Sequence, residues 1–440
     1  MPRNKYSKEK ANLREILEEA SQEAGEEVGF VQRQSKMMEK EFVETLVLGC
    51  MEQANASLTD FAQIAADLGV TITGSGIDQR ITSKGVELLK RVLERSLKQV
   101  VESQPHQPEV LQQFNGVYLL DSTYIVLAKH LAELFAGKGG SGSAAGLKLL
   151  VSFEYQSGQV VALDITSGRE PDQNCKLHLS WAKPGSLHLF DLGFFKQEIF
   201  DQLTQRGAFF VSRYQSQTAL YWQADEPRSF DVLAFLRSLP EDQADIQVYL
   251  GSRSRTPVRV LFQRLPADVV AERRRKARRK MKKEGKVPSQ RYLALLEWLI
   301  LITNIPPENL SIEQLFTLYR LRWQIEIIFK TWKSKAGLDK LGPWRLERVL
   351  AQFYARLIGL TLFHRLIAPL RFACSHELSF SKSFSIWSRY IPALAQAIAR
   401  RWRGVAALLE RIQGDLSRFA LKTSRKKSPS TYQLLLDLGA

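Results

Sequence analysis

The chain has 440 residues, 45% hydrophobic and 25% charged, which suits a globular protein built from domains of about 150 residues. Lys and Arg total 62 against 46 Asp and Glu, and the net charge of +16 indicates a polyanionic partner, nucleic acid before an acidic membrane surface. The distant cysteines, the charged N-terminus and the lack of a long apolar run argue against a disulfide framework, a zinc site, a signal peptide and a membrane span. We therefore expect a cytoplasmic protein.

Residues 1–105 have a helical pattern. Residues 1–40 are rich in Glu, Lys and Gln, which predicts either a solvated helix or an arm that touches DNA. Further along, Ser57 caps a helix through Leu68, and another helix begins near Ile81. Two short helices across a glycine-containing turn fit a helix-turn-helix and a small helical bundle alike. Pro105 and its neighbours predict a linker.

Residues 116–127 predict a buried strand with an aspartate in its middle. The run Gly-Val-Tyr-Leu-Leu-Asp-Ser-Thr-Tyr-Ile-Val-Leu is almost entirely apolar or β-prone, and Asp121 interrupts it. An isolated buried carboxylate is very costly, so Asp121 needs a partner. A hydrogen bond to a turn and a bound metal ion satisfy that requirement equally well.

A second aspartate ends a later strand in the same region. The order is three strands, two of them joined as a hairpin at 147–166, then a crossover, a strand ending at Asp191, a helix, and a strand at 207–213. This order is typical of RNase H-like folds, in which a mixed sheet carries aspartates at strand ends near a switch in strand order. The side chain of Asp191 is either a cap for the following helix or a metal ligand.

An inserted region separates this part from the next helical segment. Residues 215–265 contain β-like pieces, and ten of the fourteen residues from Arg273 to Lys286 are Lys or Arg. Such a run is either a solvated helix or mobile segment, or a surface that neutralises DNA phosphates. A strand that contains Trp298 then returns to the core.

A helix is predicted from Ser311 to Lys333. Ser311 and Gln314 form a capping box, and Pro306 and Pro307 stop whatever precedes it. At about 100° per residue one stripe collects a phenol, an acid and several cations, with an apolar face opposite. The members of that stripe are Tyr319, Arg322, Glu326, Lys330 and Lys333. An ordinary amphipathic helix has the same two faces, so periodicity alone assigns no function.

The spacing Tyr319-x2-Arg322-x3-Glu326-x6-Lys333 resembles the signature of the insertion-sequence-four family of bacterial DDE transposases. The segments Asp121-Ser-Thr and Asp191-Leu-Gly-Phe-Phe resemble that family's first and second acidic motifs. The resemblance extends from about Tyr118 to Lys333. In many relatives a basic residue follows the second aspartate, whereas this chain has Leu192, so a cation at that position is not implied.

The resemblance implies a catalytic and metal-binding set of Asp121, Asp191 and Glu326. Carboxylate ligands without a histidine or cysteine cluster favour Mg²⁺, with Mn²⁺ as a substitute. Two such ions about 4 Å apart activate an attacking water or 3′-hydroxyl and stabilise the departing oxygen of a phosphodiester. The DNA-binding set comprises Tyr319, Arg322, Lys330, Lys333, Arg273, Arg274, Arg275 and Trp298. The resemblance implies that Trp298 stacks on a flipped base, and a plain core role suits it equally.

We therefore predict an α/β protein whose RNase H-like mixed-sheet core carries a mainly β insertion and helical flanks. The predicted parts are a DNA-binding region at 1–105, a core at 112–214 and 296–340, an insertion at 215–295 and a helical region at 341–440. The predicted activity is metal-dependent cleavage of insertion-sequence ends and strand transfer by cut and paste, and the resemblance implies that the route passes through hairpin ends. The predicted partners are terminal inverted repeats and target DNA, bound by a homodimer without a membrane, in the bacterial cytoplasm at the nucleoid.

Two other functions fit the same sequence. The first is an RNase H-like nuclease that cuts DNA without strand transfer, and such an enzyme needs neither a base-stacking tryptophan nor paired ends. The second is a non-catalytic DNA-binding regulator descended from a transposase. Retention of Asp121, Asp191, Glu326 and the complete Tyr-Arg-Glu-Lys set argues against the regulator.

Overall fold

The computed structural model describes residues 5–31, 36–98, 108–139, 143–371, 377–422 and 429–438. The predicted linker at Pro105 lies outside these residues. The chain divides into two compact units. Unit 1 comprises Met1–Gln107, Ser122–Glu170 and Gln324–Pro429, and unit 2 comprises Pro108–Asp121, Pro171–Trp323 and Ser430–Ala440.

Unit 1 is mainly helical, as predicted for residues 1–105 and 341–440. Its helices and strands, in chain order, are α1 (Lys5–Arg14), a π-helical turn (Glu15–Glu19), α2 (Ala20–Val28), α3 (Glu39–Glu52), α4 (Leu58–Asp67), α5 (Gly74–Arg80), α6 (Ser83–Lys98), β2 (Ala145–Glu154), β3 (Gln159–Ser167), α14 (Trp323–Ser334, from its second residue), α15 (Leu346–Ile367), α16 (Phe380–Arg389), α17 (Ile391–Ala399) and α18 (Val405–Phe419). The predicted cap at Ser57 is confirmed, because its side chain accepts a hydrogen bond from the Asp60 amide.

Helix α15 is the centre of unit 1. Seventeen of its 22 residues are buried, including Arg356, His364 and Arg365, and it packs against α3, α6 and β3. The indole of Trp332 on α14 donates a hydrogen bond of 3.0 Å to His364 on α15. This contact, with the buried side chains of Ile328 and Phe329, fixes the apolar face of α14.

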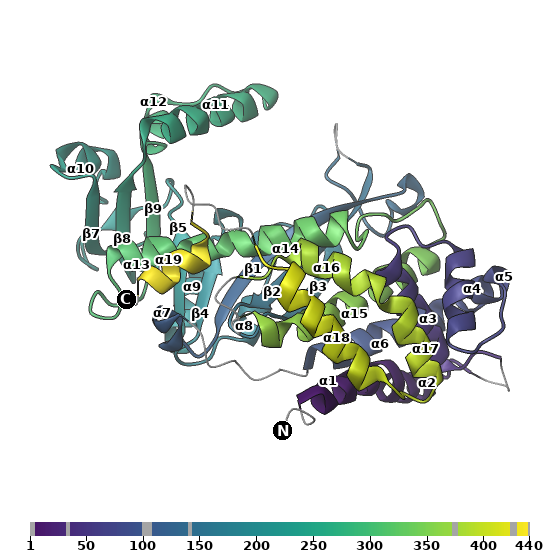
Figure 1. Ribbon diagram of the computed structural model, residues 1–440. Coiled ribbons are helices and arrows are strands. Elements are labelled where there is room, and N and C mark those ends of the chain that lie inside the picture. The colour runs from purple at the N-terminus through teal and green to yellow at the C-terminus, as the bar shows by residue number, and fades with distance from the viewer. Residues whose placement is uncertain are drawn as a thin grey trace. The chain divides into compact units, whose positions relative to one another are not determined.

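Unit 2 contains most of a nine-stranded sheet with the order β3-β2-β1-β4-β5-β9-β8-β7-β6 (Figure 1). Its strands are β1 (Val117–Leu127, up to Asp121), β4 (Leu187–Phe190), β5 (Phe209–Arg213), β6 (Leu220–Tyr221), β7 (Gln243–Leu250), β8 (Thr256–Arg264) and β9 (Trp298–Thr303). Its helices are α7 (Glu109–Gln112), α8 (Leu177–Ser180), α9 (Gln197–Gln205), α10 (Val232–Ser238), α11 (Ala267–Lys283), α12 (Gln290–Leu295), α13 (Ile312–Tyr319) and α19 (Thr431–Asp437).

The strand directions confirm the predicted RNase H-like mixed sheet. Strands β1, β4 and β5 are parallel, whereas β2 and β3 form an antiparallel hairpin and β9 runs antiparallel to β5. The side chains of the short central strand β4 are all buried, which explains its continuous apolar sequence. The carboxyl ends of β1, β4 and β5 therefore lie at one edge of the sheet.

The inserted region extends this sheet. Strand β8 pairs with β9 over six residue pairs from Arg264↔Trp298 to Arg259↔Thr303, and β7 and β6 continue outward. The segment predicted as an insertion at 215–295 thus shares a continuous hydrogen-bonded sheet with the core. The four-part domain division remains a prediction, since compactness groups this segment with the core strands of unit 2.

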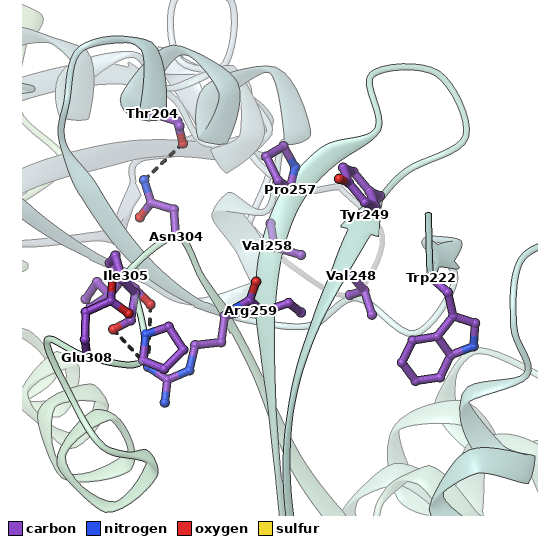
Figure 2. Close-up of a pocket in the computed structure, with 13 residues that line it drawn as sticks. Thr204, Trp222, Val248, Tyr249, Pro257, Val258, Arg259, Asn304, Ile305 and Glu308 are labelled. Carbon is purple, nitrogen blue, oxygen red and sulfur yellow. Dashed lines mark hydrogen bonds between the residues drawn. The ribbon is translucent and has the colours of Figure 1, made fainter. Parts of the chain in front are cut away.

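A buried arginine connects the insertion to the loop that precedes α13. Arg259 on β8 is 4% exposed, and its Nε donates a hydrogen bond of 2.8 Å to the Asp245 carboxylate on β7. Its Nη1 donates to the carbonyls of Ile305, Pro306 and Leu310 at 3.5, 3.4 and 2.8 Å. Figure 2 shows the side chain extending toward the loop around Ile305, beside a pocket of about 540 Å³. Arg259 therefore positions the start of α13.

The helix predicted from Ser311 to Lys333 is present but interrupted. Ser311 and Gln314 form the expected capping box at the start of α13. A 3₁₀ turn at Arg320–Arg322 then separates α13 from α14, so the prediction of one uninterrupted helix was wrong. Short 3₁₀ segments inside helices often mark a hinge, and this one ends at Arg322.

Replacing Arg259 with methionine is expected to destabilise unit 2 by about 3 kcal/mol, because the Asp245 carboxylate loses its buried partner and three carbonyls lose a donor. Urea unfolding of the full chain measures this as a lower midpoint of the first transition. Arg264→Met is the matched control, because Arg264 is on the same strand and 54% exposed, and should shift the midpoint only slightly. Equal shifts for both variants would contradict a special role for Arg259.

Candidate active site

The two predicted aspartates follow neighbouring residues on parallel strands. Leu120 on β1 is in register with Phe190 on β4, and Phe190 is in register with Ser212 on β5. The next residues along these strands are Asp121, Asp191 and Arg213. Adjacent strands lie about 4.8 Å apart, so this register gathers two carboxylates and a cation in one row at the edge of the sheet.

Arg322 joins the two carboxylates. Its Nη1 lies 3.8 Å from Oδ2 of Asp121, and its Nε lies 3.8 Å from Oδ1 of Asp191. These separations exceed hydrogen-bond length, so the contacts are ion pairs without the directionality of a hydrogen bond. The side chains of Arg322 and Asp121 are 13% and 18% exposed, whereas that of Asp191 is 40% exposed. Attraction between these charges is therefore screened less at Asp121 than at Asp191.

The side chain of Asp191 makes no capping hydrogen bond to the 3₁₀ turn at Leu192–Phe194 that follows it. The alternative that Asp191 only caps the next helix is therefore unsupported. The carboxylate faces the Arg322 guanidinium instead.

Tyr319 is held inside unit 2. Its hydroxyl donates a hydrogen bond of 3.0 Å to the carbonyl of Phe190, the residue before Asp191. Burial raises the pKa of Tyr319 well above its ordinary value, while nearby Arg322 opposes this rise, so the hydroxyl remains a donor. Tyr319 therefore fixes α13 to the end of β4. Its contact with DNA remains a prediction.

The other members of the predicted stripe lie on α14, in unit 1. Glu326 is half-buried in the first turn of α14, and Lys330 is exposed one turn further on. Lys333 donates a hydrogen bond of 2.8 Å to the carbonyl of Tyr124, three residues after Asp121 on β1. Burial lowers the pKa of Lys333, and Asp339 opposes this effect. The roles predicted for these three residues remain predictions.

A pocket of about 260 Å³ lies next to Asp191, lined by Leu192, Arg213, Arg273, Tyr292 and Trp298 among others. The ring of Trp298 is only 6% exposed, so it also belongs to the core, and its predicted stacking on a base remains a prediction. The residue after Asp191 is the uncharged Leu192. The cations that line this pocket are therefore Arg213 on β5 and Arg273 on α11. Arg213 was missed from the sequence, although aligning the carboxyl ends of the parallel strands would have identified it.

Helix α11 has an inner and an outer face. Arg273 donates to the carbonyls of Leu296 and Trp298 at 3.0 and 2.9 Å, and Arg274 donates to the carbonyl of Leu293 at 3.1 Å and to the Glu297 carboxylate at 2.6 Å. These two arginines therefore attach the helix to unit 2. Arg275 is exposed and pairs with Glu272 on the same helix. The remaining outer cations are Lys276, Arg278, Arg279, Lys280, Lys282 and Lys283.

The donor set at the strand ends suits a hard divalent cation. Asp121 and Asp191 offer oxygen ligands only, and both already lie against one positive charge. Within the described ranges no group of three or more His, Cys, Asp or Glu side chains is placed to hold a metal ion. The roles of Asp121 and Asp191 as metal ligands remain predictions. In the same described ranges, no helix combines the length and apolar character that crossing a membrane requires.

Comparison with known proteins agrees with this geometry. The transposase DDE domain family matches residues 112–362. The transposase for insertion sequence element IS231B of Bacillus thuringiensis subsp. berliner is 27% identical over 437 residues, covering 94% of this chain and 91% of that protein. The transposase for insertion sequence element IS1151 of Clostridium perfringens is 25% identical over 432 residues, covering 92% and 91%.

A solved structure is also similar. It is described as the cryo-EM structure of a piggyBac transposase synaptic complex with hairpin DNA, with a TM-score of 0.46 and 10% identity over 94% of this chain and 85% of that one. The conclusion rests on the family match, which covers more than half of the chain and includes Asp121, Asp191 and Glu326. The chain therefore belongs to the transposase DDE domain family and is a DDE transposase, an enzyme that cleaves DNA, transfers the cut strand and depends on a divalent metal ion.

Proposed function

We propose that this transposase cuts at the ends of an insertion sequence and joins the freed element to target DNA by cut and paste. The observation that carries the proposal is the row of strand ends, where Asp121 and Asp191 share Arg322 and stand beside Arg213. Two carboxylates surrounded by cations suit a phosphodiester in the presence of metal ions. Full-length similarity to insertion-sequence transposases supports the same function.

We assign Glu326 as the third catalytic carboxylate. It follows Arg322 by four residues on a backbone that is helical from Ile312 to Ser334, apart from the 3₁₀ turn. The spacing Arg322-x3-Glu326 matches the family signature, and this spacing supports the assignment. The family pattern requires an acid at this place in the chain.

The proposed cofactor is a pair of Mg²⁺ ions, for which Mn²⁺ can substitute. Asp121, Asp191 and Glu326 would hold them, since hard cations of this size prefer carboxylate oxygens. When bound, they supply positive charge against the attacking and departing oxygens of the phosphodiester. The carboxylates would orient this charge, and Arg213 and Arg322 would bind phosphate oxygens nearby. In the hairpin route the first freed 3′-hydroxyl attacks the opposite strand.

DNA contacts are proposed for three further places. Lys330 is exposed on α14, and Lys333 lies one turn further along the same helix. The outer cations of α11 form a surface suited to a phosphate backbone, and Figure 1 shows this helix projecting away from the strands of its own unit. The pocket with Trp298 and Tyr292 is proposed to receive a base unstacked near the cleaved end.

The remaining assignments complete the proposal. Residues 1–105 would recognise the terminal inverted repeats, and two copies of the chain would bind paired ends as a homodimer. The core at 112–214 and 296–340, the insertion at 215–295 and the helical region at 341–440 keep their predicted boundaries. The net charge of +16 supports association with the nucleoid in the bacterial cytoplasm.

The variants Asp121→Asn, Asp191→Asn and Glu326→Gln are each expected to lower cleavage of a labelled terminal-repeat duplex by at least about a thousandfold, because each loses a charge and a ligand. Binding to the same duplex should be retained. Cleavage is read on a denaturing gel in Mg²⁺ and in Mn²⁺. Glu308→Gln removes an exposed carboxylate elsewhere in unit 2 and should cut normally. Normal cleavage by Glu326→Gln would refute its assignment.

The same gels separate the alternative functions. A nick followed by a slowly migrating hairpin and a joined product establishes cut and paste, whereas nicks without joining indicate a nuclease. Binding without any cut in either metal indicates a non-catalytic regulator.

The triple variant Arg278→Gln, Arg279→Gln and Lys280→Gln is expected to weaken DNA binding and to reduce the slope of log K against log salt by up to about three. Glutamine keeps the helix propensity high, so α11 should persist. Fluorescence anisotropy over a salt series measures both effects. The control Arg228→Gln, Arg237→Gln and Arg253→Gln removes three exposed charges elsewhere in unit 2. Equal losses for both triples would show that only net charge matters.

A further inference from the structure

Arg322 lies where a metal ion would be needed. Its guanidinium contacts both carboxylates that the strand register places together, Asp121 through Nη1 and Asp191 through Nε, each at 3.8 Å. One guanidinium therefore bridges the two carboxylates at the place where a divalent cation would bind between them. A guanidinium stays charged at every pH that proteins tolerate, so it can leave this position only by moving.

The surroundings of Arg322 hold its backbone close to the two carboxylates. Tyr319, one turn earlier, is fixed by its hydrogen bond to the Phe190 carbonyl, and its ring centre lies 6.0 Å from the guanidinium carbon. Arg322 ends the 3₁₀ turn between α13 and α14. Its contacts with Asp121 and Asp191 are longer than hydrogen bonds, so these two ion pairs can be exchanged for other anions without loss of hydrogen-bond geometry at the carboxylates.

We propose that Arg322 is a built-in counter-ion that competes with the divalent metal for Asp121 and Asp191. This inference rests on the proposed function of these two carboxylates as metal ligands. Metal binding displaces the guanidinium, and the displaced guanidinium then becomes available to a DNA phosphate. Before metal binds, Arg322 keeps the two carboxylates close together and lowers the repulsion between them. Its role toward the metal is therefore both to position the ligands and to weaken metal binding.

The test is Mn²⁺ binding to the full-length protein without DNA, followed by the electron paramagnetic resonance signal of free Mn²⁺. Arg322→Gln removes the competing charge and should bind Mn²⁺ at least about tenfold more tightly than the wild type. Arg322→Lys keeps a positive charge on a compact ammonium, so its Mn²⁺ affinity should rise less than that of Arg322→Gln. The matched control is Arg320→Gln, which removes an exposed charge from the same 3₁₀ turn and should leave the affinity unchanged.

A structural readout uses the wild type alone, so it does not depend on a variant that folds. Phenylglyoxal modification of Arg322, mapped by mass spectrometry, should rise when Mn²⁺ is added, while modification of Arg320 should not change. Circular dichroism confirms that each variant used for affinity is folded.

Failure of the inference is distinct from failure of the proposed metal site. If Asp121→Asn and Asp191→Asn abolish Mn²⁺ binding but Arg322→Gln binds no more tightly and Arg322 labelling is unaffected by metal, the counter-ion role is wrong and the metal site stands. If Asp121→Asn and Asp191→Asn bind Mn²⁺ like the wild type, the assignment of these carboxylates is wrong, and the inference falls with it.

Discussion

Two carboxylates on neighbouring parallel strands repel each other, and the arrangement of unit 2 compensates for this repulsion. The register Leu120↔Phe190 makes Asp121 and Asp191 neighbours through backbone geometry alone, independently of their side-chain contacts. Arg322 supplies the opposing charge from the turn after α13. Arg213 adds a second cation because β5 continues the same register. The turn after α13 therefore carries a charge that offsets the repulsion at the ends of β1 and β4.

The insertion contributes to this placement. Because β8 pairs with β9, which itself pairs with β5, the inserted strands and the strand ends of the active site belong to one hydrogen-bonded sheet. Arg259, on strand β8 of this sheet, donates hydrogen bonds to the carbonyls of Ile305 and Leu310 and so holds the loop from which α13 starts. Tyr319 then fixes the other end of α13 to β4. A helix anchored at both ends presents Arg322 reproducibly.

Much of this arrangement could be predicted from the sequence, where a local pattern had a single structural meaning. Alternation and apolar runs located the strands, and the Ser311–Gln314 capping box located the start of α13. Three features depended on tertiary contacts and were missed. The 3₁₀ turn at Arg320–Arg322 interrupts a regular helical pattern, and Arg213 is identified only once the strand order is known. The hydrogen bonds of Arg273 to backbone carbonyls were not foreseen, because Arg273 has the same local sequence context as cations that remain exposed. Periodicity distinguishes buried from exposed faces, but it does not say which charges find partners inside the protein.

The charge balance around Asp121 and Asp191 also has a consequence for the order of binding. A displaced guanidinium must find another anion, since leaving it near a bound divalent ion is unfavourable. A DNA phosphate provides such an anion, so metal and DNA each make the other's binding more favourable by acting on Arg322 in the same direction. Thermodynamic linkage makes this effect reciprocal. In the proposed mechanism, an enzyme without DNA would therefore hold metal weakly, and one with an element end bound would hold it firmly. Such coupling would restrict the metal-loaded, cleavage-competent site to the complex that contains its substrate.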